Sequence, residues 1–154
     1  MTVMQTILFA FGLLCAAAMS TADWRHRIIP DVFLFPFLLA GLILGAFDAL
    51  PWVSGGIAES AIAAAIGYGL AFGMSILFKL KARGRAAREP IGMGDIKLLA
   101  AGGIWLGVTG LSIALITACV LGYVWGLRAK QKFVPFAPFF FVGAGLAIAA
   151  LMLF

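Results

Sequence analysis

Residues 98–127 read LLAAGGIWLGVTGLSIALITACVLGYVWGL, a run of 30 residues that contains no Asp, Glu, Lys or Arg. As one helix this run would extend about 45 Å, half as long again as the ~30 Å hydrocarbon core of a bilayer. As two helices it gives a pair that is somewhat short. The segment 105–110 offers a turn near the middle, because Gly107 and Gly110 favour a reversal of the chain there. How this run divides decides the number of membrane crossings.

Four further stretches lack charged residues, and each has about the length of one membrane-spanning helix. They are residues 1–22, 32–47, 60–78 and 133–154. The shortest of them, 32–47, reaches the length of a crossing when the residues that flank it are included.

The composition excludes most other classes of protein. Of the 154 residues, 64% are apolar and 11% are charged, against roughly 45–50% and about 25% in a soluble domain. So few charged side chains cannot cover the surface of a soluble protein of this size. Nucleic acid is disfavoured as a partner, because the net charge of +5 is confined to a few loops. The composition therefore predicts an all-α, polytopic membrane protein.

The positions of the basic residues distinguish a topology of five crossings from one of six. They are Arg25, Arg27, Lys79, Lys81, Arg83, Arg85, Arg88, Lys97, Arg128, Lys130 and Lys132. Short loops rich in Lys and Arg stay on the cytoplasmic side of a membrane. Six helices, with a turn at 106–110, place every basic loop on that side, whereas five would put the last three bases outside. We therefore predict a bundle of six transmembrane helices with both termini on the outer face.

Glycines recur four positions apart within the apolar stretches and predict close helix packing. The pairs are Gly41 and Gly45, Gly69 and Gly73, Gly103 and Gly107, and Gly122 and Gly126. Four pairs on four helices favour packing inside one bundle over a dimer motif. The two cysteines form no CxxC pair, so we expect no zinc site, no other metal and no cofactor.

Two of the six acidic residues stand out by position. Asp23 follows the first apolar stretch, and Asp95 ends Gly92-Met-Gly-Asp95 just before an apolar helix. The predicted topology places both at the cytoplasmic end of the bundle, where ionisable groups face a polar cavity or each other. A simpler interpretation makes Asp23 an ion-pair partner of Arg27 and Asp95 a helix N-cap.

The glycines before Asp95 favour a functional interpretation. Gly92 and Gly94 let another backbone come close, so that an extended peptide could lie against this turn. Paired carboxyl groups hydrolyse amides when an ionised carboxylate takes a proton from water and its protonated partner donates one to the carbonyl oxygen. Two carboxylates about 4 Å apart repel by roughly 4 kcal/mol at an effective dielectric of 20, so such a pair can hold one proton at cellular pH.

Three motifs in this order resemble those of the type IV prepilin peptidase family, intramembrane aspartic proteases of the GxGD class. They are Asp23 with Arg27-Ile-Ile-Pro-Asp31, Gly92-Met-Gly-Asp95-Ile-Lys97, and Val134-Pro-Phe-Ala-Pro-Phe139. The resemblance covers nearly the whole chain. It implies that Asp23 and Asp95 are the catalytic pair and that Gly92 and Gly94 shape the turn beside Asp95.

The resemblance also implies an endopeptidase of the bacterial inner membrane, with periplasmic termini and cytoplasmic basic loops. Family members cut the basic leader from prepilins or pseudopilins, after a glycine at the cytoplasmic face, and so supply type IV pili or type II secretion. Larger members begin with a domain that carries two CxxC pairs and is associated with N-methylation. We expect residues 1–154 to form a single transmembrane peptidase domain without it, as in minimal, peptidase-only members.

Substrate leaders and the cytoplasmic loops of this chain are both basic, so they would not attract each other. We expect the loop at 79–88 to bind anionic lipid headgroups, while Asp31 and Glu89 face the leader. Asp31 departs from the Asn that the family often has, and Ala137 replaces the glycine of its Pro-Phe-Gly-Pro motif. Lys97 should point away from the Asp95 side chain. We expect it to bind substrate or support the active site, and the simpler interpretation is that it anchors headgroups.

Two other classes of function stay open, and the sequence leaves the oligomeric state undetermined. A small transporter would use Asp23 and Asp95 to relay protons or bind cations, and would need polar residues deep in its helices. The candidates for these are Ser75, Thr109, Ser112 and Thr117. A non-catalytic assembly scaffold would instead use the glycine pairs as docking faces.

Overall fold

The computed structural model describes residues 2–81, 91–130 and 134–153, and in these ranges it contains five α-helices and no strand. They are α1 (Val3–His26), α2 (Asp31–Ala46), α3 (Gly56–Lys81), α4 (Met93–Ala129) and α5 (Phe136–Leu153). All except α2 are long and apolar enough to cross a membrane. The predicted all-α class is confirmed, and the chain is a polytopic membrane protein.

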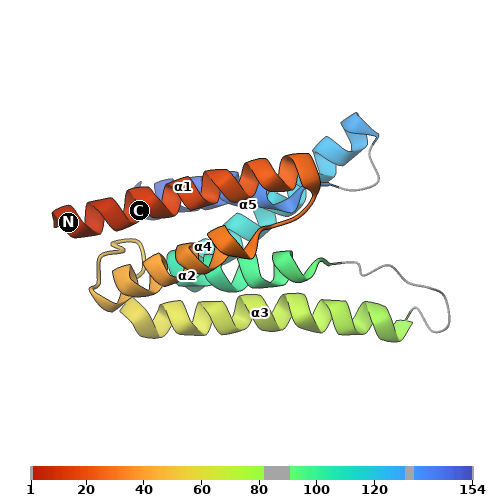
Figure 1. Ribbon diagram of the computed structural model, residues 1–154. Coiled ribbons are helices and arrows are strands. Elements are labelled where there is room, and N and C mark those ends of the chain that lie inside the picture. Colours follow the sequence, from red (N-terminus) through yellow and green to blue (C-terminus); the bar gives the residue numbers. More distant parts are fainter. Residues whose placement is uncertain (1, 82–90, 131–133, 154) are drawn as a thin grey trace.

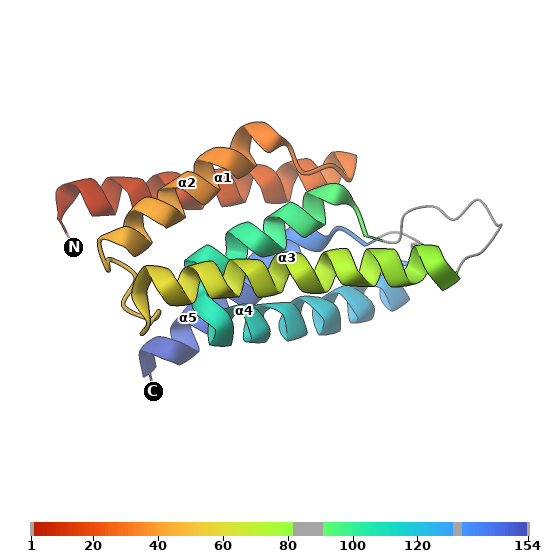
Figure 2. The ribbon, with the colours of Figure 1, turned by 90° about the horizontal axis from the view of Figure 1, so that it is seen from below.

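A break at Gly107 divides α4 into two halves. Gly107 has φ 66° and ψ −176°, a conformation that is essentially restricted to glycine. Figure 2 shows that the halves, green and light blue, run in opposite directions from this point. The sequence predicts six helices with a turn at 106–110, whereas the described residues contain five. The difference arises because the chain reverses within one broken helix rather than in a loop between two.

Side chains from the α2–α3 connection and from the first turn of α3 satisfy the backbone at this break. The Glu59 carboxylate accepts hydrogen bonds from the Val108 amide at 3.3 Å and the Gly55 amide at 2.7 Å. The indole of Trp52 donates to the Trp105 carbonyl at 2.7 Å. Backbone groups at a helix end lack intrahelical partners, so these contacts stabilise the reversal. The sequence analysis assigned no role to Glu59.

The helices place both termini at one end of the bundle (Figure 1). The ends of α1, α3 and α4 and the starts of α4 and α5 lie at the opposite end (Figure 1). The basic residues within the described ranges belong to these segments: Arg25, Arg27, Lys79, Lys81, Lys97, Arg128 and Lys130. We call this the basic end of the bundle.

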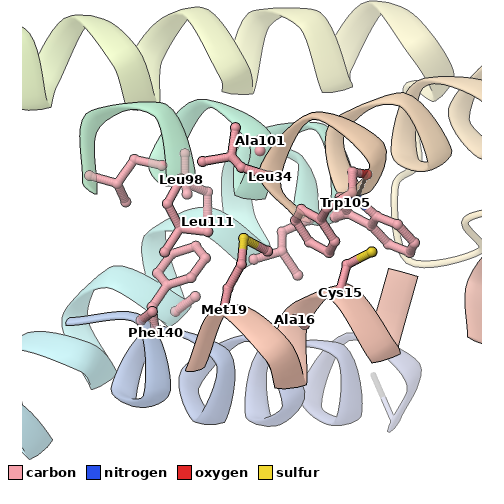
Figure 3. Packing of buried hydrophobic residues seen from close by; sticks show 14 of the residues in the cluster. Cys15, Ala16, Met19, Leu34, Leu98, Ala101, Trp105, Leu111 and Phe140 are labelled. Atoms are coloured by element: carbon pink, nitrogen blue, oxygen red, sulfur yellow. Dashed lines mark hydrogen bonds between the residues drawn. The ribbon is translucent and has the colours of Figure 1, made fainter. Parts of the chain in front are cut away.

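Trp105 occupies the centre of the core between α1 and α2. Its ring lies against Gly12 and Gly41, where any added Cβ would collide with it. It stacks on Phe37 with ring centroids 4.9 Å apart, and its indole donates to the Phe37 carbonyl at 2.9 Å. Figure 3 shows Trp105 and Met19 together with Leu34, Leu111 and Phe140 in the same apolar interior. The first half of α4 is thereby fixed against α1, α2 and α5.

Glycines also let α4 approach its neighbours at the backbone. A Cβ on Gly103 would lie 2.5 Å from the Ala63 carbonyl carbon of α3, and a Cβ on Gly143 would lie 2.6 Å from the Ala114 oxygen of α4. The expectation of packing inside the bundle is wrong for Gly69 and Gly73, because a Cβ there meets no described atom within 4 Å. These two glycines lie on an outer face of α3.

Replacing Gly103 by Ala should lower the thermal unfolding temperature in detergent. The methyl group overpacks the α3–α4 contact, at a cost of about 1–3 kcal/mol. Gly69→Ala is the matched control and should leave the temperature unchanged or raise it, since Ala favours helix without a clash there. Equal unfolding temperatures for the two variants would contradict the close approach at Gly103.

Replacing Glu59 by Ala should also lower the unfolding temperature, because the Val108 and Gly55 amides lose a charged acceptor. Hydrogen bonds to charged groups contribute about 1.5–3 kcal/mol. Glu59→Gln keeps one acceptor oxygen, so its unfolding temperature should lie between those of Glu59→Ala and the wild type. A wild-type temperature for Glu59→Ala would show that the α4 break does not depend on this side chain.

Candidate active site

Asp23 lies in the last turn of α1 with its side chain almost fully buried, at 5% exposure. A negative charge at the C-terminal end of its own helix is unfavourable. The carboxylate is instead held by the start of α5, where it accepts a hydrogen bond from the Ala137 amide at 2.8 Å. The Phe136 amide also interacts with it. The unpaired amides and the positive end of the α5 dipole therefore stabilise the Asp23 carboxylate.

The sequence at 135–138 explains why α5 begins at this point. Pro135 precedes the helix and Pro138 lies in its first turn, where the missing N–H of proline costs no hydrogen bond. The amides of Phe136 and Ala137 are left free to face Asp23. Because a backbone amide makes the contact, Ala137 can replace the family's glycine. The sequence analysis missed this role of Ala137, although the two prolines marked the helix start.

Asp95 is the third residue of α4 and is partly buried. The N-cap of this helix is Gly92, so the simpler interpretation of Asp95 as the N-cap is wrong. The Asp95 carboxylate turns back towards Gly92, where an added Cβ would lie 3.3 Å from its Oδ2 atom. The Gly92 backbone interacts with this carboxylate. Gly92 therefore makes room for the Asp95 side chain.

The carboxyl groups of Asp23 and Asp95 lie close enough for their charges to interact. Both belong to helix ends that lie at the basic end of the bundle (Figure 1). The charge of Arg27 also acts on Asp23. Burial and the Ala137 hydrogen bond nevertheless distinguish Asp23 from an exposed ion-pair partner. The fold thus brings together two acidic side chains that are 72 positions apart (23 to 95) in the sequence.

Gly94 joins the α1–α2 connection to this turn. A Cβ on Gly94 would lie 3.0 Å from the Cβ of Ile29, which is buried. The space that this glycine provides is filled by the protein itself, whereas Gly92 is exposed. An extended peptide at this turn would therefore approach on the Gly92 side.

Lys97 and Asp31 form an ion pair between α4 and the first residue of α2. The Lys97 ammonium contacts both Asp31 carboxylate oxygens, at 2.8 and 2.9 Å, and the two side chains are 34% and 50% exposed. Lys97 therefore has a partner within the protein, two residues from Asp95. Glu89, the other acid expected to face the leader, lies outside the described residues.

Three aromatic side chains pack around the end of α1. Trp24 lies 5.4 Å from Trp125 of α4 and 6.4 Å from Phe139 of α5, measured between ring centroids. The guanidinium of Arg27 lies over the Trp125 ring at 5.7 Å. This cluster connects α1, α4 and α5 beside Asp23. Its only signal in the sequence was the placement of Trp near charged residues, as at membrane interfaces.

The arrangement supports acid–base chemistry by two carboxyl groups. Among the residues that the structure describes, no three His, Cys, Asp or Glu side chains group as metal ligands would. The site has one carboxylate bound to backbone amides and a second beside a glycine turn that is partly open. Hydrolysis by an acidic pair needs one ionised and one protonated carboxyl group, and two carboxyl groups in such different surroundings are suited to it.

Comparison with known proteins finds relatives over most of this chain. A "Prepilin leader peptidase/N-methyltransferase" of Burkholderia pseudomallei (strain 1026b) is 37% identical over 150 residues, covering 92% of this chain and 46% of the relative. A protein of the same name from Stutzerimonas stutzeri is 31% identical over 149 residues, covering 92% and 48%. The chain spans about half the length of these relatives. No solved structure gives a significant match.

Residues 8–127, well over half of the sequence, match the description "Type IV leader peptidase family". The chain therefore belongs to the type IV leader peptidase family.

Proposed function

We propose that this chain hydrolyses a peptide bond in prepilin-like membrane proteins, with Asp23 and Asp95 as its catalytic pair. The observation that carries the proposal is that the buried Asp23 and the partly buried Asp95 lie at one end of the bundle, where the charge of Asp23 acts on Asp95. The substrates are prepilins or pseudopilins, cut after a glycine at the end of a basic leader. Family membership and the names of the relatives support this substrate class.

The surroundings of the two carboxyl groups suggest different roles for them. The Ala137 amide stabilises the ionised form of Asp23, which makes Asp23 the base that takes a proton from water. Asp95 would be the protonated partner that donates to the carbonyl oxygen of the scissile bond. The resulting hydroxide adds to the carbonyl carbon and gives a gem-diol intermediate. Asp23 then gives its proton to the amide nitrogen while Asp95 takes a proton from one hydroxyl, so that the C–N bond breaks and the amine of the mature protein is released. Both carboxyl groups thereby return to their starting protonation states. Gly92, the exposed glycine, lets the extended substrate backbone approach Asp95.

We further propose that the protein crosses a bacterial inner membrane six times, with each half of α4 as one crossing and both termini in the periplasm. The described bases gather at the end that carries Asp23 and Asp95, which the positive-inside rule assigns to the cytoplasm. Bases there, including Lys79 and Lys81, would also bind anionic headgroups. The residues matched in the relatives would form the peptidase unit of this family.

The helix interiors give little support to a transporter. The Ser112 hydroxyl donates to the Val108 carbonyl and the Thr117 hydroxyl to the Ile113 carbonyl, both at 2.8 Å within α4. These hydroxyls are engaged by their own helix. The buried polar or charged residues in the described part of the chain are Asp23, Ser60 and Ser75, so few groups could line a path for a cation.

Asp23→Asn and Asp95→Asn should each reduce leader cleavage by at least about a hundredfold, because general acid–base catalysis contributes roughly 10²–10⁴-fold. The measurement is leader removal from a co-expressed prepilin on a gel, together with the amount of variant in the membrane. Asp48→Asn is the matched control at the opposite end and should cleave normally. Normal cleavage by either catalytic-pair variant would exclude the peptidase mechanism.

The Asp31–Lys97 pair gives a second test, since we propose that it holds α2 against the Asp95 turn. Asp31→Asn and Lys97→Met should each lower turnover by about two- to fivefold, as expected for a partly exposed ion pair of about 0.5–1 kcal/mol. The double variant Asp31→Lys/Lys97→Asp, which exchanges the two charges, should restore much of the lost turnover.

The original expectation that Asp31 attracts the basic leader predicts a different pattern. Asp31→Asn would then raise KM, and Lys97→Met would lower KM by leaving the Asp31 charge unpaired. Opposite changes in KM with unchanged kcat would therefore contradict a positioning role. For Glu89, which stays a proposed leader contact, Glu89→Gln should raise KM for a basic leader.

A further inference from the structure

A cavity of about 440 Å³ lies between the second half of α4 and the start of α5. Its lining includes Cys119, Gly122, Tyr123 and Gly126 of α4, together with Val134 and Phe136. Cys119 and Tyr123 are exposed, so the cavity opens at the surface of the bundle. We call it the α4–α5 groove.

The groove is elongated along α4. Its lining on that helix runs from Ala118 to Leu127, a rise of about 14 Å at 1.5 Å per residue. Val134 packs over Gly122 and Gly126, where an added Cβ would lie 3.3 and 3.1 Å from its side chain. The shape suits a segment of polypeptide better than one side chain.

The start of α5 links the groove to Asp23. Phe136 lines the groove, and the amides of Phe136 and Ala137 bind the Asp23 carboxylate. Phe139 also lines the groove and packs against Trp24, the residue that follows Asp23. A peptide in the groove would therefore have one end beside the candidate catalytic pair.

The chemistry of the lining selects which part of a substrate can bind. Among the described residues, none that lines the groove is charged, so these residues offer no partner to the Lys or Arg of a basic leader. An unpaired charge in such an apolar site would be costly. The residues that follow the cut in a single-span substrate are apolar and can bury their side chains there.

We propose that the α4–α5 groove binds the first residues of the substrate's membrane-spanning segment, immediately after the scissile bond. This inference rests on the proposed peptidase function and assigns a binding site to one side of the cut. The leader would then extend from Asp95 towards the aqueous face of the basic end. A lipid acyl chain is the competing occupant of an apolar groove.

Cross-linking through the native Cys119 tests the occupant directly. Synthetic precursor peptides would contain a basic leader, a glycine and about 20 apolar residues, with one cysteine placed at successive positions. They would be mixed with the Asp95→Asn protein in vesicles and oxidised with copper phenanthroline. We expect a disulfide from positions just after the cut, none from the leader, and none with Cys119→Ser. Cross-links from the leader alone, or from no position, would overturn the proposal.

A large side chain that fills the groove gives an independent test, in which the KM for precursor peptides is measured. Gly126→Leu should raise KM for the long precursor by about tenfold or more, within the range of steric effects on specificity. A short peptide that ends two residues after the cut should be cleaved as by the wild type, which also shows that Gly126→Leu is folded. Gly73→Leu on the outer face of α3 is the matched control and should cleave both peptides normally.

The outcomes separate the two proposals. If the wild type cleaves neither peptide, the proposed peptidase function fails. If the wild type cleaves both, and Gly126→Leu has an unchanged KM for the long precursor, the groove does not bind substrate and an acyl chain becomes its occupant.

Discussion

The hydrogen bond from the Ala137 amide to the Asp23 carboxylate is the contact on which the site depends. It places a buried acid from the end of α1 at the N-terminus of α5, where free amides and the helix dipole offset the cost of burying a charge. The same contact joins helices from opposite ends of the sequence. Without it, Asp23 would be a buried charge at the unfavourable end of its own helix.

Close helix packing brings the second acid to the same place. Gly12 and Gly41 admit the Trp105 ring, and Gly103 brings α4 against the backbone of α3. These contacts fix the first half of α4, and with it the turn that carries Asp95. The reversal at Gly107 then returns the second half of α4 to the basic end (Figure 2), where it packs beside α5. The candidate catalytic pair and the α4–α5 groove thus both depend on α4.

Features that follow from charge and chain length could be predicted from the sequence. The uncharged runs located the apolar helices, and the excess length of 98–127 with its glycines located the reversal at Gly107. Partnerships between distant side chains and backbone could not be predicted, because composition and spacing do not specify them. The Ala137 amide, the Glu59 contacts and the Lys97–Asp31 pair are of this kind. The prediction of close packing failed for Gly69 and Gly73, because glycines four positions apart occur both on packed faces of helices and on outer faces.

The most direct test of the account measures whether residues 23 and 95 are close together in the membrane-embedded protein. Cysteines would replace Asp23 and Asp95 in a chain that carries Cys15→Ser and Cys119→Ser. Short bifunctional thiol reagents should join them within one molecule, whereas a cysteine pair at 48 and 95, from opposite ends of the bundle, should stay unlinked. If the 23–95 pair resists every short reagent while each thiol reacts singly, the two acids do not share a site and the account is wrong.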